Sequence, residues 1–251
     1  MKPGYHPLVR KLEHYARFSD AEREALAAAC ADVRRCAARE DLVREGEPAG
    51  AMNVVLSGFA CRYRVIADGR RQIVVFFVPG DFCDYRNVLL ERTDHGVATL
   101  TQSSVASIAP AALEALIARW PTIERALARA QLVEAAITRE ALVSIGQRTA
   151  GERLAHLFCE LFWRLRAVGQ TRGAACELPF TQTELGDTLG LSAVHVNRTL
   201  QELRRSGLIT LRERELTIHD LDALSTLALF DPVYLHLDDR PAAADDGRER
   251  A

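Results

Sequence analysis

The sequence predicts an α+β protein in which an antiparallel β-roll or jelly roll is followed by a long helix and then by a small, mainly helical unit. Three observations predict this. From about residue 39 to residue 108, glycines punctuate short runs rich in Val, Ile and Phe, as in short strands joined by turns. Residues 121–146 form a helical pattern without a breaker. Residues 181–218 then carry two short helical patterns and a hairpin pattern.

The bulk properties of the chain indicate a globular protein. Its 251 residues suffice for one large domain or two ordinary ones, and a hydrophobic content of 48% supports the burial of real cores. The N-terminus lacks the apolar run and cleavage site of a signal peptide, and no later segment approaches the ~20 apolar residues of a membrane span. We therefore expect a cytoplasmic protein with no membrane partner.

Charge and cysteine content exclude some classes of function. A formal net charge of -2 excludes a uniformly basic coat for nucleic acid, but it leaves room for a local basic patch. The six cysteines contain no C-x-x-C pair, so neither a zinc ribbon nor a thioredoxin-type site is expected. Free cysteine behaves as a small hydrophobic residue, so we expect reduced, mostly buried thiols and no metal site.

The strand prediction is clearest over residues 59–78. Residues 59–65 alternate between apolar and polar side chains, which is the period of a strand with one buried face. Residues 72–78 are more uniformly apolar, and Asp68-Gly69 between the two runs is a strong hairpin signal. Upstream, Ser19 and Glu22 form a capping box that begins a helix. A roll of this size has room for one small ligand, although side chains fill many such rolls.

The long helix carries two apolar stripes. At roughly 25 residues and ~1.5 Å each it makes a rod of nearly 40 Å, too long for one small domain to cover on every side. One stripe repeats at alternating spacings of four and three, and we expect it to form a dimer interface. Its residues are Ile123, Leu127, Ala130, Glu134, Ile137 and Ala141.

The second stripe lies beside the first and would then pack on the β-roll. It comprises Leu132, Val133, Ala136 and Val143. In the dimer, Glu134 would approach its twin and weaken the interface, because like charges repel. The alternative is an ordinary amphipathic helix that packs only within the monomer.

Residues 146–151 are expected to form the hinge into the second domain, which opens with an amphipathic helix over residues 151–168. His156 and Glu160 in that helix have a spacing compatible with metal ligands. No second ligand cluster accompanies them, so we expect a solvated flank. We expect residues 169–176 to be a flexible link.

The stretch from Thr181 onward carries the chemistry. A capping box over residues 181–184 begins a helix that Gly190 ends, and Ser192 can cap a second helix running to about Ser206. Two short helices joined by a tight glycine turn form the helix-turn-helix pattern. Residues 208–218 then predict a small hairpin, the wing.

The second helix has an outward face suited to DNA bases. Arg198 can offer two hydrogen bonds to guanine, Asn197 or Gln201 can pair with adenine, and Val194 can meet a thymine methyl group. Other side chains near the helix start and on the wing suit phosphate oxygens, which set register rather than sequence. These are Thr181, Thr183, Ser192, His195, Arg212 and Arg214.

At this point the residues resemble a known family. From about residue 53 to residue 218 the chain is similar to the Crp/Fnr family of bacterial transcription regulators. The motifs that carry the resemblance are LSGFACRYRVIADGRRQIVVFFVPGDF and TELGDTLGLSAVHVNRTLQELRRSGLI. The resemblance implies a cyclic-nucleotide-binding-like sensor, a dimerisation helix, a homodimer on two-fold symmetric double-stranded DNA, and RNA polymerase as a partner. It divides the chain into residues 1–118 (sensor), 119–147 (dimerisation helix), 148–235 (winged helix-turn-helix) and 236–251 (disordered tail).

Two departures from the family pattern affect specificity and signal. Val194 stands where family members typically carry glutamate, so we expect a different operator. Members that bind cyclic AMP grip the cyclic phosphate with an Arg-Ser or Arg-Thr pair. Here Arg92-Thr93 precedes Asp94, whose charge would repel a phosphate, so we do not expect cyclic AMP.

The effector stays unknown. Candidate effector-site residues are Cys61, Gly80, Asp81, Phe82, Cys83, Asp94 and His95. Cys30 and Cys36 are too few and too widely spaced for the iron–sulfur cluster of the oxygen-sensing branch, so we do not expect one. A haem held by His95 or a cysteine, and redox chemistry at Cys61 or Cys83, are the alternatives left open.

The sequence gives less support to other classes of function. The sequence contains no G-x-S-x-G, P-loop, G-x-G-x-x-G or H-E-x-x-H motif, so we do not expect an enzyme. The other rival is a ligand-sensing or protein-interaction module whose winged helix does not bind DNA. The salt dependence of DNA affinity distinguishes this module from a DNA-binding regulator, because affinity that depends on phosphate contacts falls steeply as salt rises.

Overall fold

The computed structural model describes residues 6–85 and 87–237. Two short helices, α1 (Pro7–Leu12) and α2 (Asp20–Ala29), precede the β-roll. Ser19 and Glu22 form the predicted capping box at the start of α2. The strands of the roll are β1 (Val33–Cys36), β2 (Asp41–Val43), β3 (Met52–Ser57), β4 (Ala60–Val65), β5 (Arg71–Phe77), β6 (Phe82–Cys83), β7 (Gly96–Thr99) and β8 (Ser103–Ile108). A single 3-10 turn, η1 (Asn87–Leu89), lies between β6 and β7.

The β-roll consists of two four-stranded antiparallel sheets. Their strand orders are β1-β8-β3-β6 and β2-β7-β4-β5. The hairpin between β4 and β5 turns at Asp68-Gly69, and Gly69 has a φ of +87°, which favours glycine. The predicted antiparallel roll is therefore confirmed.

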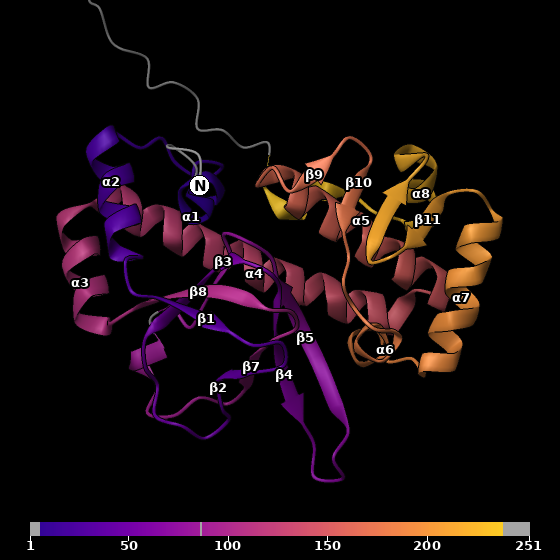
Figure 1. Cartoon of the computed structure of the whole chain (residues 1–251), viewed down its shortest axis with the longest axis horizontal. Coiled ribbons are helices and arrows are strands. Elements are labelled where there is room, and N and C mark those ends of the chain that lie inside the picture. Colours follow the sequence, from indigo (N-terminus) through magenta and orange to yellow (C-terminus); the bar gives the residue numbers. More distant parts are fainter. Residues whose placement is uncertain (1–5, 86, 238–251) are drawn as a thin grey trace, which may run out of the picture.

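Helices and a second small sheet follow the roll. The helices are α3 (Pro110–Arg119), α4 (Pro121–Gln147), α5 (Ala150–Ala167), α6 (Gln182–Leu189), α7 (Ala193–Arg205) and α8 (Leu221–Ala228), with a 3-10 turn η2 (Pro232–Leu235). The strands are β9 (Thr171–Arg172), β10 (Ala175–Glu177), β11 (Ile209–Arg212) and β12 (Glu215–Ile218). Figure 1 shows α4 running most of the length of the molecule, behind the roll and toward the C-terminal helices.

The expected flexible link at residues 169–176 is wrong. Residues 171–177 form β9 and β10, which extend the wing sheet in the order β11-β12-β10-β9. Cys176 pairs with Leu216 and is buried at 3% exposure. The link is ordered because its backbone pairs with β12 and because the side chain of Cys176 joins the core of the second domain. Most of the predicted disordered tail, residues 238–251, lies outside the described residues.

The assignment of the two stripes of α4 is also wrong. Of the predicted dimer interface, Ile123, Leu127, Ala130 and Ile137 are at most 6% exposed within the single chain. Ala141 is half-buried. The exposed apolar residues of α4 are instead Leu132, Leu142, Val143 and Ile145. The helix turns its larger continuous apolar face inward because burial of that face removes more apolar surface from water.

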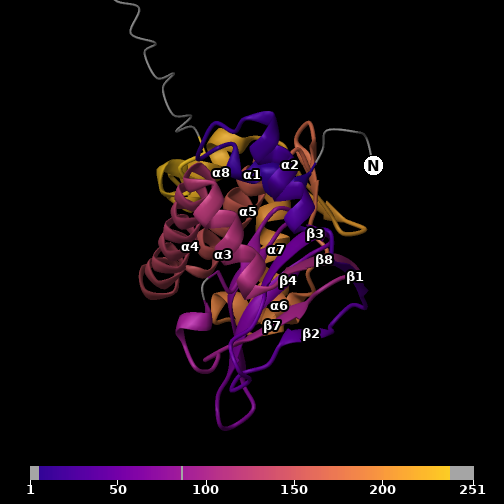
Figure 2. The ribbon, with the colours of Figure 1, turned by 90° about the vertical axis from the view of Figure 1, so that its left-hand side faces the viewer.

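One hydrophobic core connects the two halves of the molecule. A single cluster of buried side chains runs from α1 through the roll, α4 and α5 into the C-terminal helices. Figure 2 shows α4 at the outer left of the molecule, with the roll on its other side, so that one long side of α4 is uncovered. No helix in the described ranges is long and apolar enough to span a membrane.

Candidate nucleic-acid interface and effector site

The two helices α6 and α7 are joined by a tight turn that glycine makes possible. Gly190 ends α6 with a left-handed φ of 66°, and Ser192 caps α7 by accepting a hydrogen bond from the amide of His195. A Cβ on Gly186 would lie only 2.4 Å from the carbonyl oxygen of Leu191. Thr181 and Glu184 form the predicted capping box at the start of α6. The glycine turn and the two caps set the angle between α6 and α7.

The outward face of α7 is solvent-exposed where the sequence predicts base contacts. Val194 is 81% exposed. Asn197 and Arg198 are exposed beside it, while Gln201 and His195 are half-buried. The opposite face packs into the domain through Val196, Thr199, Leu200 and Leu203.

The wing is held against α7 by a side chain. Glu213 and Arg214 form the two-residue turn of the β11–β12 hairpin. Both residues have left-handed backbones, with φ values of 49° and 69°. Nη2 of Arg204 donates to the carbonyl oxygen of Leu211 at 2.5 Å. Arg212 and Arg214 are exposed at the tip. The wing therefore presents positive charge next to the end of α7.

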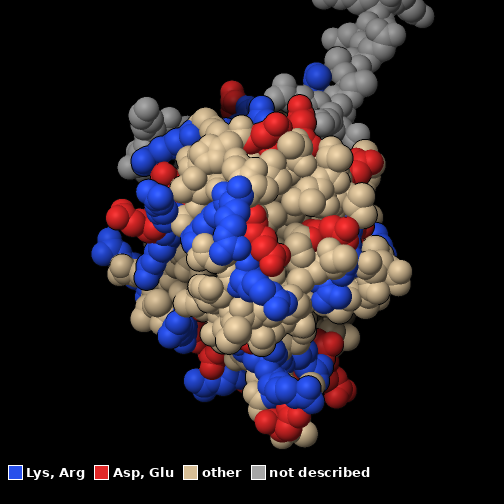
Figure 3. All heavy atoms as spheres, turned by 90° about the vertical axis from the view of Figure 1, so that its right-hand side faces the viewer, with Lys and Arg blue, Asp and Glu red and all other residues tan. Residues whose placement is uncertain are grey.

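The predicted DNA-contact residues fall into three groups on this domain. Thr181 and Thr183 are exposed at the start of α6. Ser192, Val194, His195, Asn197, Arg198 and Gln201 lie along the first half of α7, and Arg212 and Arg214 lie on the wing. In Figure 3, which faces this end of the molecule, basic side chains lie at the centre and along the lower edge, with acidic side chains among them.

The C-terminal domain docks on the roll next to this surface. Nε of Arg71 on β5 donates to Oδ2 of Asp187 at 2.9 Å, and Nε2 of Gln72 donates to the carbonyl oxygen of Thr188 at 3.1 Å. Both partners lie on α6. The orientation of the winged helix is therefore linked to the sheet that contains β5.

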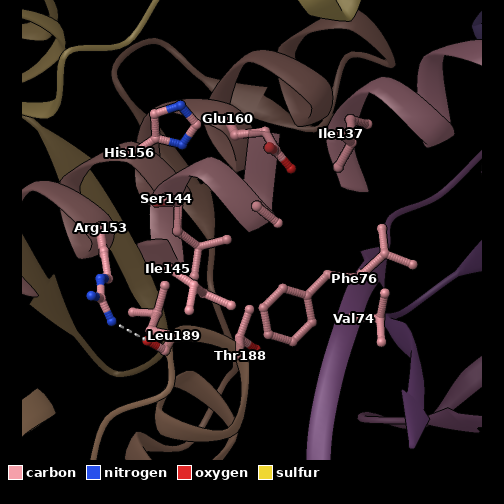
Figure 4. Close-up of a pocket in the computed structure, with 13 residues that line it drawn as sticks. Val74, Phe76, Ile137, Ser144, Ile145, Arg153, His156, Glu160, Thr188 and Leu189 are labelled. Atoms are coloured by element: carbon pink, nitrogen blue, oxygen red, sulfur yellow. Dashed lines mark hydrogen bonds between the residues drawn. The ribbon is translucent and has the colours of Figure 1, made fainter. Parts of the chain in front are cut away.

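A small cavity lies at this junction of the two domains. Figure 4 shows Phe76 and Val74 from β5 facing Ser144 and Ile145 of α4, with Thr188 of α6 closing the space. Its volume of about 40 Å³ holds one or two water molecules but no nucleotide.

His156, on the wall of that cavity, corrects another prediction. His156 and Glu160 were expected on a solvated flank, but they are 4% and 6% exposed. The His156 ring stacks on Tyr234 and packs edge-on against Phe230, both from the C-terminal segment. Burial lowers the pKa of His156 to about 4, with Arg148 adding to the effect. His156 is thus a neutral core residue at the hinge.

A capping box at the hinge was missed by the sequence analysis. Thr149 caps α5 by accepting from the amide of Glu152, whose carboxylate accepts from the amide of Thr149 in return. The T-x-x-E signal was present in the sequence. Arg148 donates to the carbonyl oxygens of Ala228 and Leu229, so the C-terminal segment also holds the hinge.

Asp81, a predicted effector residue, is the centre of a structural ion cluster. Its side chain pairs with Lys11 of α1 and with Nη2 of Arg164 of α5 at 2.8 Å, and it accepts from the amide of Val78 at 2.7 Å. Burial raises the pKa of Asp81, but Lys11 and Arg164 outweigh it and hold the pKa below its usual value. Asp81 therefore joins three parts of the fold. Gly80 fits here because its φ is +93° and a Cβ would lie 2.6 Å from the carbonyl oxygen of Pro7.

The two candidate cysteines are enclosed in the roll. Cys61 is 0% exposed and Cys83 is 1% exposed. Burial raises the pKa of the Cys61 thiol to about 12, and burial together with Asp84 raises the pKa of Cys83. Reactive cysteines have the opposite shift and partial exposure. Phe82 is 4% exposed and lines a small hollow together with residues of α4.

The space between the roll and α4 is filled by side chains. Arg62 pairs with Glu134 of α4 and lies over the ring of Phe77 at 5.2 Å from its centroid. The remaining hollow beside them, of about 20 Å³, has room for one water molecule. A cyclic nucleotide does not fit there. The predicted contact between the two Glu134 side chains of a dimer is wrong, because the Glu134 carboxylate pairs with Arg62 of the same chain.

The described residues also offer no suitable ligands for a haem or an iron–sulfur cluster. Both ring nitrogens of His95 face carboxylate oxygens, one of Asp84 and one of Asp94. Cys30 and Cys36 are buried in separate elements. No group of three or more His, Cys, Asp or Glu side chains within residues 6–85 and 87–237 is arranged to hold a metal ion.

The fold and the α7 surface together define a DNA-binding transcription regulator with a sensor-type β-roll. The model of the Crp-like helix-turn-helix domain matches residues 152–227, and that of the cyclic nucleotide-binding domain matches residues 33–119. The nitrogen fixation regulation protein FixK of Bradyrhizobium diazoefficiens is 31% identical over 176 residues, which are 69% of this chain and 72% of that protein. The chain belongs to the Crp/Fnr family.

A second relative agrees with this assignment, and a solved structure shares the fold. The transcriptional activator protein anr of Pseudomonas aeruginosa is 28% identical over 190 residues, covering 76% of this chain and 77% of that protein. The solved structure of FixK2 from Bradyrhizobium japonicum covers 78% of this chain and 96% of its own, with a TM-score of 0.70 and 24% identity. That structure is similar to this chain in fold.

Proposed function

We propose that the protein is a homodimer that binds a two-fold symmetric DNA operator through α7 and changes transcription from nearby promoters. The observation that carries the proposal is the exposed face of α7. Among the described residues, Asn197 and Arg198 make no hydrogen bond or ion pair through their side chains, and Val194 beside them is 81% exposed. Exposed side chains along the first half of the second helix of a helix-turn-helix are placed where this motif contacts base edges.

The roles of the individual side chains follow from their chemistry. Arg198 reads guanine through two hydrogen bonds, Asn197 or Gln201 pairs with adenine, and Val194 contacts a thymine methyl group. Ser192, the amides at the start of α7 and the wing arginines bind phosphates. Thr181, Thr183 and His195 border the same surface and bind the backbone of the duplex.

The second copy covers the exposed side of α4. Alternating spacings of four and three place a stripe on the uncovered face, with two large leucines that are 68% and 71% exposed. The stripe comprises Ala128, Leu132, Ala135, Arg139 and Leu142. Pairing of two such helices would bring two α7 helices to half-sites about one turn of DNA apart.

The regulator would act in the cytoplasm, where it meets DNA and RNA polymerase. Because the described side chains fill the space between the roll and α4, we do not propose a cyclic nucleotide as its signal. The salt dependence of binding separates this function from docking on protein. An operator complex made through several phosphates must lose affinity steeply between about 50 and 200 mM salt.

Arg198→Ala tests the proposal. On the preferred operator we expect a loss of about 1–3 kcal/mol and relaxed preference at one base pair, with little change on random DNA. Arg35→Ala, which removes an exposed arginine from β1, is the matched control and should change neither affinity. Equal losses on specific and random DNA for Arg198→Ala would contradict its role as a base reader.

A further inference from the structure

A buried ionic cluster joins the roll to α4 at a point that the DNA-binding surface does not use. We call it the Arg62 cluster, and its members are Arg62 on β4, Asp84 after β6, His95 before β7 and Glu134 on α4. Arg62 pairs with Glu134, and its Nη2 lies 4.0 Å from Oδ1 of Asp84. Nε2 of His95 lies 2.9 Å from the same oxygen. All four side chains are at most 16% exposed.

The geometry of His95 favours the protonated ring. Its Nδ1 lies 2.7 Å from Oδ1 of Asp94, while its Nε2 faces Asp84. A neutral imidazole has one N–H, so only the imidazolium form can donate to both carboxylates. Burial and Arg62 lower the pKa of His95, but the hydrogen bonds with Asp84 and Asp94 outweigh them and leave the pKa above its ordinary value. The two carboxylates therefore favour the charged ring over the neutral one.

The charges of the cluster balance only while His95 carries its proton. Two cations, Arg62 and His95, then face two buried carboxylates, Asp84 and Glu134. Without the proton, Arg62 alone serves both carboxylates, and a buried charge that loses its partner is costly. Asp94 is 77% exposed and can turn toward water.

Among the described residues, Arg62 and His95 are the cations within ion-pair distance of Asp84, and Arg64 pairs with Glu45 and acts on the exposed Asp94. Nδ2 of Asn87 donates to Oδ1 of Asp84 at 2.7 Å but is uncharged. The thiol of Cys83 stays neutral because burial and Asp84 raise its pKa. Within residues 6–85 and 87–237, Oδ2 of Asp84 and Nε of Arg62 have no hydrogen-bond partner. Loss of the His95 proton would leave Arg62 shared between Asp84 and Glu134.

We propose that the Arg62 cluster is a proton-sensing site that controls how α4 is held on the roll. With His95 protonated, Arg62 anchors Glu134 and α4 keeps the position seen here. Without the proton, Glu134 is released, α4 shifts beside the exposed stripe at Leu132 and Ala135, and DNA affinity falls. The effect on DNA rests on the proposed function, whereas the coupling between His95 and Glu134 does not.

The coupling is tested by histidine NMR on the full chain. The ring Cε1–H signals are followed from about pH 5 to pH 9, and His95→Gln identifies the signal of His95. In Glu134→Gln one buried carboxylate is gone, so the pKa of His95 should fall by about 0.5 or more. Glu114→Gln, on the exposed side of α3, is the matched control and should leave that pKa unchanged. An unchanged pKa in Glu134→Gln would overturn the coupling.

The control of DNA binding is tested on the operator that the protein selects, at pH 6 and pH 8.5 and constant salt. Wild type should lose about five-fold or more in affinity at the higher pH, whereas His95→Gln should be weak at both, with less than about a two-fold difference. A wild-type pH profile in His95→Gln would overturn the switch. If wild type binds no operator at either pH, the proposed function fails, and the NMR result still decides the coupling.

Discussion

The candidate functional polar residues of the winged helix are exposed to solvent, whereas those of the roll are buried in contacts with other side chains. On α7, Asn197 and Arg198 point into solvent without partners among the described residues. In the roll, Asp81 and His95 are fully engaged with side chains from other elements. The first arrangement is suited to a partner that arrives from outside. The second holds separate elements of the fold together.

Breaking the buried cluster around Asp81 should have the largest effect. Asp81→Asn leaves Lys11 without a carboxylate and leaves Arg164 with Glu160 as its remaining one. The loss of one partner from a buried ion pair costs about 3–5 kcal/mol of unfolding free energy. Urea unfolding followed by circular dichroism measures it. Asp68→Asn breaks an ion pair on the 53% exposed Asp68 at the β4–β5 turn and should cost less than about 1 kcal/mol. Similar losses for both variants would remove the distinction between the two kinds of pair.

The hinge histidine should make stability depend on acid. The folded-state pKa of His156, about 4, lies below the ordinary value of 6.5. The stability that the neutral ring contributes is therefore complete above pH 6.5 and is lost as pH falls toward 4, by roughly 3 kcal/mol. His156→Phe keeps a ring against Phe230 and Tyr234 but cannot be protonated, so its stability should fall less over this range. His219→Gln, on the exposed end of the wing, should follow wild type. Parallel curves for wild type and His156→Phe would show that His156 does not titrate this way.

Charging the uncovered face of α4 should separate the two subunits. Leu142→Asp places a carboxylate on the exposed stripe, and we expect the dimer to dissociate about 30-fold more readily, or about 2 kcal/mol. Sedimentation equilibrium measures the dissociation constant, and the melting temperature of the monomer should hardly change. Val33→Asp makes a comparable change on β1, away from α4, and should leave self-association unaltered. A dimer as stable as wild type in Leu142→Asp would place the interface elsewhere.

The smallest effect should come from the apolar member of the α7 surface. Val194→Ala removes two methyl groups, so the preference for one thymine over other bases should weaken by about 1 kcal/mol. Competition binding with operators changed at single positions measures it. Arg212→Ala should instead weaken all sequences about equally and reduce the slope of log affinity against log salt by about 0.9. A uniform loss in Val194→Ala would mean that this side chain reads no base.

Local signals made much of the fold predictable from the sequence. The capping boxes at Ser19 and Thr181, the Asp68-Gly69 hairpin and the glycine turn at Gly190 depend on residues close together in the chain, and all are present. The order of roll, long helix and winged helix follows from them. The exposed base-facing side of α7 could be predicted as well, because the pattern of one helix shows which face is buried.

Contacts between distant elements could not be predicted in the same way. Two apolar stripes on α4 compete for the same neighbour, and only the packed roll shows that Ile123 and Leu127 face inward. The partners of Glu134 and Asp81 lie 72 and 83 residues away, on strands and helices whose placement no local pattern determines. The strands β9 and β10 are too short to show a period. Of the effector-site residues chosen by motif, Cys61, Asp81, Phe82 and Cys83 are buried in the fold, whereas Asp94 is exposed.

Selection from a random duplex library by the purified wild-type protein, at physiological salt and near pH 6, tests the central claim most directly. Sequencing of the bound fraction should show an inverted repeat with half-sites about one turn of DNA apart, and Arg198→Ala should lose preference at one symmetric pair of positions. An enriched motif without two-fold symmetry, or no enrichment in the presence or absence of cell extract, would contradict a dimer that reads DNA through α7.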